Sequence, residues 1–309
     1  MKKRRHFPLA KVNFPVFLAP MVGLSHRALR KLIRLYLPKE LVICWPTEML
    51  NSRRLPHENL NHLPEVFKDV DEGYFCPQLL GNDQFFLSQS IKKLEEWGAA
   101  AVDINMGCPV TKALKHNYGV ALMGDPQYAA NVVQWSVEAA RVPISVKLRA
   151  GLQRDVEYLI QFVRRLVDAG ASWVTLHPRL AHEARRGRAD WDLFPLIRNA
   201  IAVPLIGNGD VSHVDDVFYL LETLQCDGVM IGRAAAAKPW LFAQVAQRMG
   251  YAPRRELPRN SFEEAREYFA CCRRLWRELL IDYGAPLALR KFQFYIRMTH
   301  VWLDFGLRF

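Results

Sequence analysis

Eight short apolar runs recur along this chain, and segments with helical spacing separate most of them. The runs cover residues 16–19, 41–45, 74–80, 101–105, 144–148, 173–177, 203–207 and 228–231. The helical segments include residues 84–97, 128–140, 156–169 and 214–224. Because the runs are continuously apolar rather than alternating, they predict parallel strands that are covered on both faces. Eight β/α units in order predict an α/β fold, a (β/α)8 TIM barrel with its active site at the carboxyl ends of the strands.

The β/α alternation stops after Trp240, and the remaining residues have a different pattern. Residues 263–280 and 287–303 have helical spacing, and Ser261 with Glu264 predicts a capping box before the first of these helices. We therefore expect a TIM-barrel catalytic domain over residues 1–240 and a small helical domain over residues 241–309. The segment 51–73 lacks clean periodicity and is expected to be a long functional or mobile loop.

The chain is basic, with 42 Lys and Arg against 31 Asp and Glu and a formal net charge of +11. Such an excess suits a polyanionic partner, although a basic protein without one would have the same composition. Two groups of arginines are candidates for this contact: Arg185, Arg186 and Arg188 in one loop, and Arg273, Arg274 and Arg277 in the tail. The tail group lies within about one helical turn, so at least two of its members share a face. The alternative for this group is a solvated helix face.

The six cysteines are scattered without a C-x-x-C pair, which suggests neither a zinc site nor a disulfide framework. No apolar run reaches the length of a membrane span, and Lys11 and Asn13 interrupt the stretch that a signal peptide would need. We expect a cytoplasmic enzyme without a metal or a membrane contact. Nothing in the sequence requires more than a monomer.

Cys108 is the strongest candidate for a catalytic residue. It follows the fourth predicted strand, where Gly107 ends the strand and Pro109 fixes the backbone after the thiol. Parallel α/β folds place their chemistry at this position. A buried structural cysteine is the usual alternative, and the placement between Gly and Pro disfavours it.

Polar residues also end most of the other strands, and burying them without partners would be costly. The turns Asn208-Gly209 and Gly232-Arg233 follow strands seven and eight, where TIM barrels bind phosphate through backbone N–H groups. Lys147 would project a cation into the mouth of the barrel, unless it pairs with a core carboxylate such as Asp103. His177 is a candidate for cofactor or substrate contact, with a structural histidine as the alternative.

The ordered motifs A-P-M, Q-L-L-G, N-M-G-C-P-x-x-K, V-K-L-R, H-P-R, N-G-D, I-G-R and K-P-W resemble the tRNA-dihydrouridine synthase family over residues 16–242. The resemblance implies a flavin-dependent TIM barrel followed by a helical domain. It implies FMN as cofactor, NADPH as reductant and tRNA as partner, with uridine reduced to 5,6-dihydrouridine. This chain has Pro178 and Leu180 where the family usually has Gly and Thr.

The resemblance also assigns roles to individual residues. Cys108 would protonate C5 of uracil after hydride reaches C6, and a cysteine thiol is mostly protonated at neutral pH. The implied cofactor residues are Pro20, Met21, Val22, Gln78, Lys147, His177, Asn208, Gly209, Asp210, Gly232 and Arg233. The implied substrate residues, besides the two arginine groups, are Asn105, Lys112 and Arg179.

Other functions remain compatible with these residues. A small-molecule FMN barrel of the dihydroorotate or dihydropyrimidine dehydrogenase type would share the strand-end cysteine, but it would not need a basic tail. A catalytically silent RNA-binding relative would not need Cys108 together with Lys147. Ribosomal RNA is a further possible substrate for the same chemistry. No G-x-G-x-x-G follows a strand, so NADPH is expected to share the uridine pocket.

Overall fold

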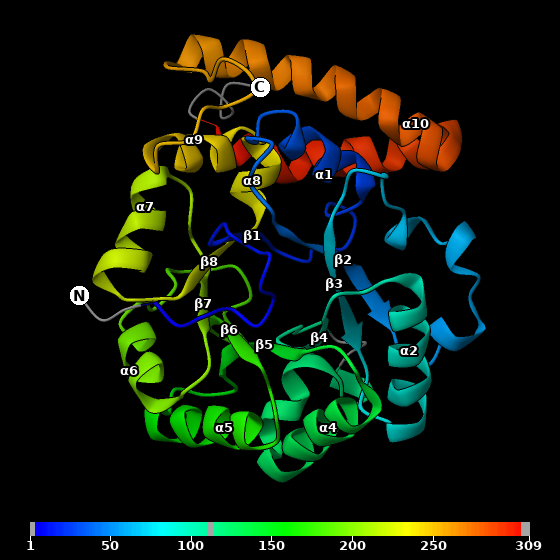
Figure 1. The fold of residues 1–309 in the computed structure, drawn as a ribbon, viewed down its shortest axis with the longest axis vertical. Coiled ribbons are helices and arrows are strands. Elements are labelled where there is room, and N and C mark those ends of the chain that lie inside the picture. Colours follow the sequence, from blue (N-terminus) through cyan, green and yellow to red (C-terminus); the bar gives the residue numbers. More distant parts are fainter. Residues whose placement is uncertain (1–3, 111–113, 304–309) are drawn as a thin grey trace.

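The computed structural model describes residues 4–110 and 114–303, and its strands form the expected TIM barrel (Figure 1). The strands are β1 (Val16–Leu18), β2 (Cys44–Asn51), β3 (Tyr74–Leu80), β4 (Val102–Met106), β5 (Ile144–Gly151), β6 (Trp173–Leu180), β7 (Leu205–Asn208) and β8 (Gly228–Ile231). They are parallel and pair in the order β1-β8-β7-β6-β5-β4-β3-β2. Because β8 pairs with β1 while β1 and β2 end the order, the barrel is nearly closed.

Helices surround the barrel, and aspartates begin several of them. They are α1 (Arg27–Arg34), α2 (Gln84–Trp97), α4 (Pro126–Ala139), α5 (Val156–Asp168), α6 (Leu193–Ala200), α7 (Val214–Phe218), which continues as a π turn (Tyr219–Thr223), and α8 (Arg233–Ala237). Asp83, Asp125 and Asp155 each accept a hydrogen bond from the backbone N–H three residues on, as N-cap residues do. Gly98 ends α2 with φ 97°, a conformation that favours glycine.

The predicted strand 41–45 was wrong in its position. The strand begins at Cys44 and continues to Asn51, through Pro46, Thr47 and Glu48. Thr47 and Glu48 are polar yet almost completely buried. Glu48 accepts hydrogen bonds from Gly23 N and Lys291 Nζ, at 2.6 and 3.3 Å. Since these partners lie far away in the sequence, the local apolar pattern did not indicate the strand.

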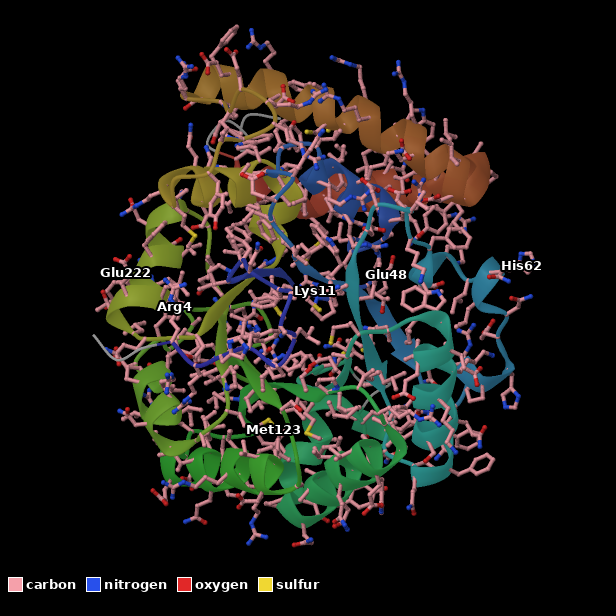
Figure 2. The ribbon with its side chains drawn as sticks, in the orientation of Figure 1. Arg4, Lys11, Glu48, His62, Met123 and Glu222 are labelled. Carbon is pink, nitrogen blue, oxygen red and sulfur yellow. The ribbon has the colours of Figure 1, made fainter. Side chains whose placement is uncertain are left out.

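The barrel interior changes from apolar to polar towards the carboxyl ends of the strands. Phe7 and Leu9 of the amino-terminal segment pack with Phe17 and Trp173 at the apolar end. Lys11 of this segment lies near the middle of the view in Figure 2. Between this cluster and the carboxyl ends, strands β4 to β6 place a polar side chain inward at every second position, as the pleat requires. These side chains are Asp103 and Asn105, Ser145 and Lys147, and Thr175 and His177.

The segment after β2 is irregular, as predicted, and it is tied to α1. It contains three short 3-10 turns, Leu55–His57, Leu60–His62 and Pro64–Val66, and Figure 2 shows His62 at the outer edge of the molecule. Its last residues make ion pairs with α1. Arg30 pairs with Glu72 at 2.7 Å with both side chains fully buried, and Arg34 pairs with Asp69.

The tail consists of α9 (Leu241–Arg248), α10 (Ser261–Thr299) and a 3-10 turn (His300–Trp302). Helix α10 reverses direction at Gly284, whose φ of 67° and ψ of 165° are not helical. Tyr268 therefore reaches Thr299, 31 positions away, with 2.7 Å between their hydroxyl oxygens. Figure 1 shows the first arm (orange) outermost and the second arm (red) between it and the barrel. The two predicted helices are thus the two arms of one hairpin.

The predicted capping box at Ser261 was wrong. Asn260 is the N-cap, and its side chain accepts a hydrogen bond from Glu263 N. Glu264 instead forms an ion pair with Lys238 of the barrel at 3.3 Å. Over residues 4–110 and 114–303, no helix is long and apolar enough to cross a membrane. Within the same residues, no group of three or more His, Cys, Asp or Glu could hold a metal ion.

Candidate active site at the carboxyl ends of the strands

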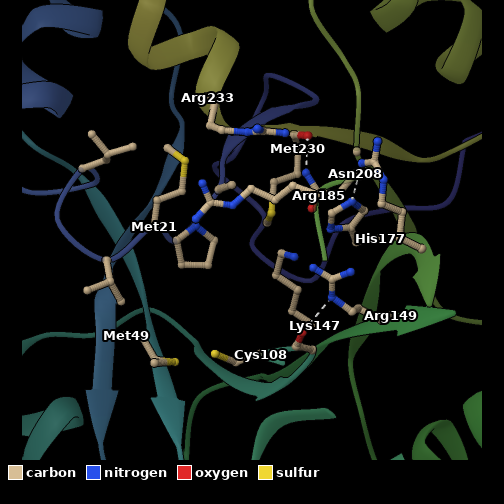
Figure 3. A pocket seen from close by; sticks show the side chains of 18 of the residues that line it. Met21, Met49, Cys108, Lys147, Arg149, His177, Arg185, Asn208, Met230 and Arg233 are labelled. Carbon is tan, nitrogen blue, oxygen red and sulfur yellow. Dashed lines mark hydrogen bonds between the residues drawn. The ribbon is translucent and has the colours of Figure 1, made fainter. Parts of the chain in front are cut away.

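A cavity of about 340 Å³ opens at the carboxyl ends of the strands (Figure 3). Its volume falls in the usual range for small-ligand sites. The predicted residues that line it are Pro20, Met21, Val22, Gln78, Asn105, Cys108, Lys147, His177, Arg179, Arg185, Asn208, Gly209, Asp210, Gly232 and Arg233. Val22 lies at the rim, where it is 58% exposed. The strand-end positions therefore converge on one cavity.

The other predicted residues that the structure describes do not line this cavity. Arg186 is exposed and donates to His182 O at 3.4 Å, and Arg188 lines a separate hollow next to Asp190. The tail arginines lie on α10, with Arg274 in an ion pair with Glu267 at 3.1 Å. Lys112 falls outside the described residues.

The loop of Cys108 is held by its own strand and by a glycine. The backbone N–H groups of Gly107 and Cys108 donate to Asn105 Oδ1 at 3.1 and 2.9 Å. Val120 N donates to Cys108 O, and a Cβ on Gly119 would lie only 2.6 Å from that oxygen. The close approach therefore needs glycine at position 119, where φ is 58°. Cys108 is partly exposed and lines the cavity, unlike a buried structural cysteine.

Lys147 brings a cation with a lowered pKa to the cavity. Burial lowers the pKa of Lys147 to about 8; attraction to Asp103 opposes this change, and repulsion from Arg149 adds to it. Asp103 itself accepts hydrogen bonds from Ser145 and Gln78. Among the described residues no ion pair joins Lys147 to Asp103. Lys147 thus remains directed to the cavity that it lines.

His177 is a neutral imidazole packed on the turn after β7. Burial lowers the pKa of His177 to about 2, and the nearby cations Lys147 and Arg149 add to this effect. A Cβ on Gly209 would lie 2.6 Å from His177 Cδ2, and φ at Gly209 is 111°. Only glycine therefore allows the turn and the ring to approach this closely.

Asp210 is engaged by protein groups rather than free in the cavity. Its carboxylate pairs with Arg179 at 2.6 Å and accepts from Ala189 N at 2.7 Å. Arg179 also donates to Gly187 O at 2.7 Å. The two side chains therefore anchor the arginine-rich loop that follows β6.

The end of the cavity at the turns after β7 and β8 is cationic. Arg185 and Arg233 line it, and burial and repulsion by Arg185 lower the pKa of Arg233. Asn208 Nδ2 donates to Met230 O at 2.8 Å and so ties the two turns together. A Cβ on Gly232 would contact Met21 Sδ at 3.5 Å and occupy part of the cavity wall. These features suit an anionic group, such as a phosphate, close to the backbone.

The sequence model of the family described as "Dihydrouridine synthase (Dus)" matches residues 17–301. The chain belongs to the dihydrouridine synthase family. The resemblance seen in the motifs is thus confirmed, and it extends through the tail.

Individual relatives agree with this family. The chain is 33% identical over 244 residues to a probable tRNA-dihydrouridine synthase 1 of Synechocystis sp., covering 79% of this chain and 67% of the relative. It is 34% identical over 279 residues to a probable tRNA-dihydrouridine synthase of Rhizobium leguminosarum, covering 89% and 81%. It is 30% identical over 234 residues to tRNA-dihydrouridine synthase B of Pseudomonas syringae, covering 76% and 68%.

Arg149 also belongs to the site, although the sequence analysis did not single it out. Its guanidinium donates to Gly107 O at 3.0 Å, to Leu180 O at 3.1 Å and to Ala184 O at 2.9 Å. It therefore joins the loop of Cys108 to the arginine-rich loop after β6. The signal was present, because Arg149 lies two positions after Lys147 and so projects from the same side of the strand.

The tail also contributes to the cavity, which the sequence did not predict. Phe294, Met298 and Trp302 line it from the second arm of α10 and the final turn. A Cβ on Gly23 would lie 3.0 Å from Phe294, and Arg185 Nη1 lies 3.5 Å from Met298 Sδ. The cavity of this synthase-family chain is therefore completed by residues that lie far beyond the last strand in the sequence.

Proposed function

We propose that this chain reduces specific uridines in tRNA to 5,6-dihydrouridine, with FMN as its cofactor and NADPH as the reductant. One observation carries the proposal: the Cys108 thiol and the Lys147 ammonium line the same cavity, whose opposite side is cationic (Figure 3). A proton donor, a charge-stabilising group and an anion-binding end are what this chemistry requires of the protein. Membership of the dihydrouridine synthase family supports it independently.

The residues of the cavity suit FMN. Met21, Met49 and Met230 offer an apolar wall for a flat ring. Lys147 and the amides of Gln78 and Asn105 offer polar edges, and Arg185 and Arg233 offer charge for the phosphate. When bound, FMN supplies the transfer of hydride from NADPH to C6 of uracil. NADPH and uridine would use the cavity in turn.

The chain's own residues would supply binding and proton transfer. Cys108 would donate its proton to C5 of uracil as hydride is added at C6. Lys147 would stabilise negative charge that develops beside it in the low-dielectric cavity. The uridine must leave its stack to enter the cavity, which costs a few kcal/mol and less in an already unstacked loop.

The first arm of α10 supports tRNA as the partner, with a basic face that differs from the predicted one. Arg266, Arg273 and Arg277 are exposed and share one side of the helix with Phe262 and Phe269. Among the residues that the structure describes, none of these three arginines is in an ion pair. We call these three residues the outer arginines.

Two acidic residues of the same arm form ion pairs with the barrel and its helix α1. Glu264 pairs with Lys238, and Glu278 pairs with Arg27 and Lys31. Arg274 pairs with Glu267, so it is a weaker candidate for RNA contact than the other two predicted arginines. The separation of charge leaves a cationic outer face for a phosphate backbone. A small-molecule dehydrogenase would have no use for such a face.

The test is to form dihydrouridine with purified components. The protein, supplied with FMN and NADPH, is incubated with tRNA from a strain that lacks dihydrouridine, and the nucleosides are analysed by mass spectrometry. The proposal expects flavin absorbance and conversion of one or a few uridines. The absence of flavin bands in the purified protein, and again after addition of FMN and removal of the unbound flavin, would overturn it.

A further inference from the structure

A directed chain of hydrogen bonds runs from the barrel interior to the loop of Cys108. Ser145 Oγ donates to Asp103 Oδ1 at 2.6 Å, and Gln78 Nε2 donates to Asp103 Oδ2 at 2.7 Å. Asn105 Nδ2 then donates to Gln78 Oε1 at 2.8 Å. Asn105 Oδ1 finally accepts from Cys108 N at 2.9 Å. All four side chains that these hydrogen bonds join are buried, and Gln78 is only 1% exposed.

The carboxylate of Asp103 fixes the direction of these hydrogen bonds at one end, and the backbone N–H groups of Gly107 and Cys108, which donate to Asn105 Oδ1, fix it at the other. The two ends of an amide have nearly the same shape, so its hydrogen-bond partners determine which end points where. Burial raises the pKa of Asp103, and the hydrogen bonds from Ser145 and Gln78 and the nearby Lys147 oppose this change. The ionised carboxylate only accepts, so Gln78 turns its NH2 group towards Asp103. Its oxygen then faces Asn105, which must present its own NH2 group there. The Asn105 oxygen is thereby directed at the backbone of Cys108.

Loss of that direction would release the cysteine loop. If Gln78 turned over, its NH2 group would face the NH2 group of Asn105. Either these two donors would meet, or Asn105 would turn its own NH2 group towards the N–H groups of Gly107 and Cys108. In the second case, two backbone groups would lose their acceptor. The side chains of Asp103, Gln78 and Asn105 are buried, so water does not replace a partner that is lost between them, and such mismatches are costly.

We infer that Asp103 is a positioning residue that fixes the amides of Gln78 and Asn105 and, through them, the backbone of Cys108. It contacts neither the Cys108 thiol nor the opening of the cavity. Its effect on catalysis rests on the proposed function, whereas its effect on the geometry of the Cys108 loop does not.

An exchange of the carboxylate and the amide between positions 103 and 78 tests this inference. Asp103→Asn keeps the shape but allows Gln78 to turn over, and Gln78→Glu places two carboxylates 2.7 Å apart in the present geometry. The double variant restores one direction: the new amide at position 103 accepts from Ser145 and donates to the new carboxylate at position 78, which still accepts from Asn105. If the single variants acted only through the volume of the side chains, the double variant would not recover. Ser145→Ala is the control, because it removes a donor without reversing any amide.

The measured quantity is the rate at which iodoacetamide alkylates Cys108, followed by peptide mass spectrometry, with Cys108→Ala as the background. Cys44, Cys226, Cys271 and Cys272 are buried and should react slowly. Asp103→Asn and Gln78→Glu, each alone, should raise the rate at least about threefold, as expected for coupled neighbours. The double variant and the control Ser145→Ala should stay close to the original rate. Failure of the double variant to recover, with both singles altered and folded, would overturn the inference.

Asn105→Ala provides a second route if the buried variants do not fold. It removes the acceptor of Cys108 N directly and should also raise the alkylation rate about threefold. An unchanged alkylation rate would show that these hydrogen bonds do not hold the Cys108 loop, and it would overturn the inference. Formation of dihydrouridine is measured in parallel. If even the unaltered protein makes none, the proposed function fails, while the alkylation pattern still decides the role of Asp103.

Discussion

The guanidinium of Arg233 lies 4.7 Å from the ring centre of Trp302, so the turn after β8 meets the end of the tail at the cavity. Arg233 begins α8, and Trp302 belongs to the last described turn of the chain. Phe294 and Met298 extend the same contact along the cavity wall. The helical tail is therefore part of the candidate site rather than an appendage to the barrel.

This contact predicts that the tail helps to retain the cofactor. Trp302→Ala should weaken FMN binding about tenfold, or about 1.4 kcal/mol, because Arg233 loses its stacked partner and the cavity loses a wall. Fluorescence quenching of FMN on titration with protein measures the affinity. Phe262→Ala, on the exposed outer face of α10, is the control and should leave the affinity unchanged. Equal affinity in all three proteins would refute a role of Trp302 in binding.

The lowered pKa of Lys147 predicts a pH dependence of FMN binding. A lysine with a pKa of about 8 is a cation below that pH and loses its charge as the pH rises through 8. The affinity for FMN should therefore fall severalfold between about pH 7 and about pH 9, while the flavin phosphate keeps its charge. Lys147→Met should bind more weakly and show a flatter profile. Profiles of the same slope in both proteins would contradict the assignment.

The outer arginines predict a surface for tRNA. Replacing Arg266, Arg273 and Arg277 together by Glu should weaken tRNA binding at least about tenfold and make the dependence on salt shallower. FMN binding should be unaffected, because these residues do not line the cavity.

The matched control has the same change of charge on the other side of the barrel. Arg164 and Arg165 on α5 and Arg141 just after α4 are exposed, and both helices lie away from α10 in Figure 1. Replacement of these three arginines by Glu should cost much less affinity. An equal loss in both triple variants would mean that only the overall charge matters.

The sequence predicted the barrel because its strands are continuously apolar and end in glycine or polar residues. Residues 74–80 and 228–231 were predicted with the bounds that the structure has. Strand β2 was misplaced because Glu48 is buried through a contact with Lys291 in the tail. Local patterns do not contain such long-range pairs.

The residues of the candidate site also fall into those that local sequence rules predict and those that depend on long-range packing. The rule that parallel strands carry function at their carboxyl ends found Gln78, Cys108 and Lys147, all of which line the cavity. It did not find Trp302, because that residue reaches the cavity only after α10 folds back at Gly284. Nor did it show that Arg274 pairs with Glu267 while Arg273 is exposed, since this depends on how the helix packs.

The central claim is that Cys108 protonates uracil in tRNA at the mouth of the barrel. The most direct measurement compares the unaltered protein with Cys108→Ala, each loaded with FMN and reduced by NADPH, and counts dihydrouridine per tRNA by nucleoside mass spectrometry. We predict that Cys108→Ala binds FMN and consumes NADPH to reduce it, as the unaltered protein does, but forms almost no dihydrouridine. Dihydrouridine formed at the same rate by both proteins would contradict the claim.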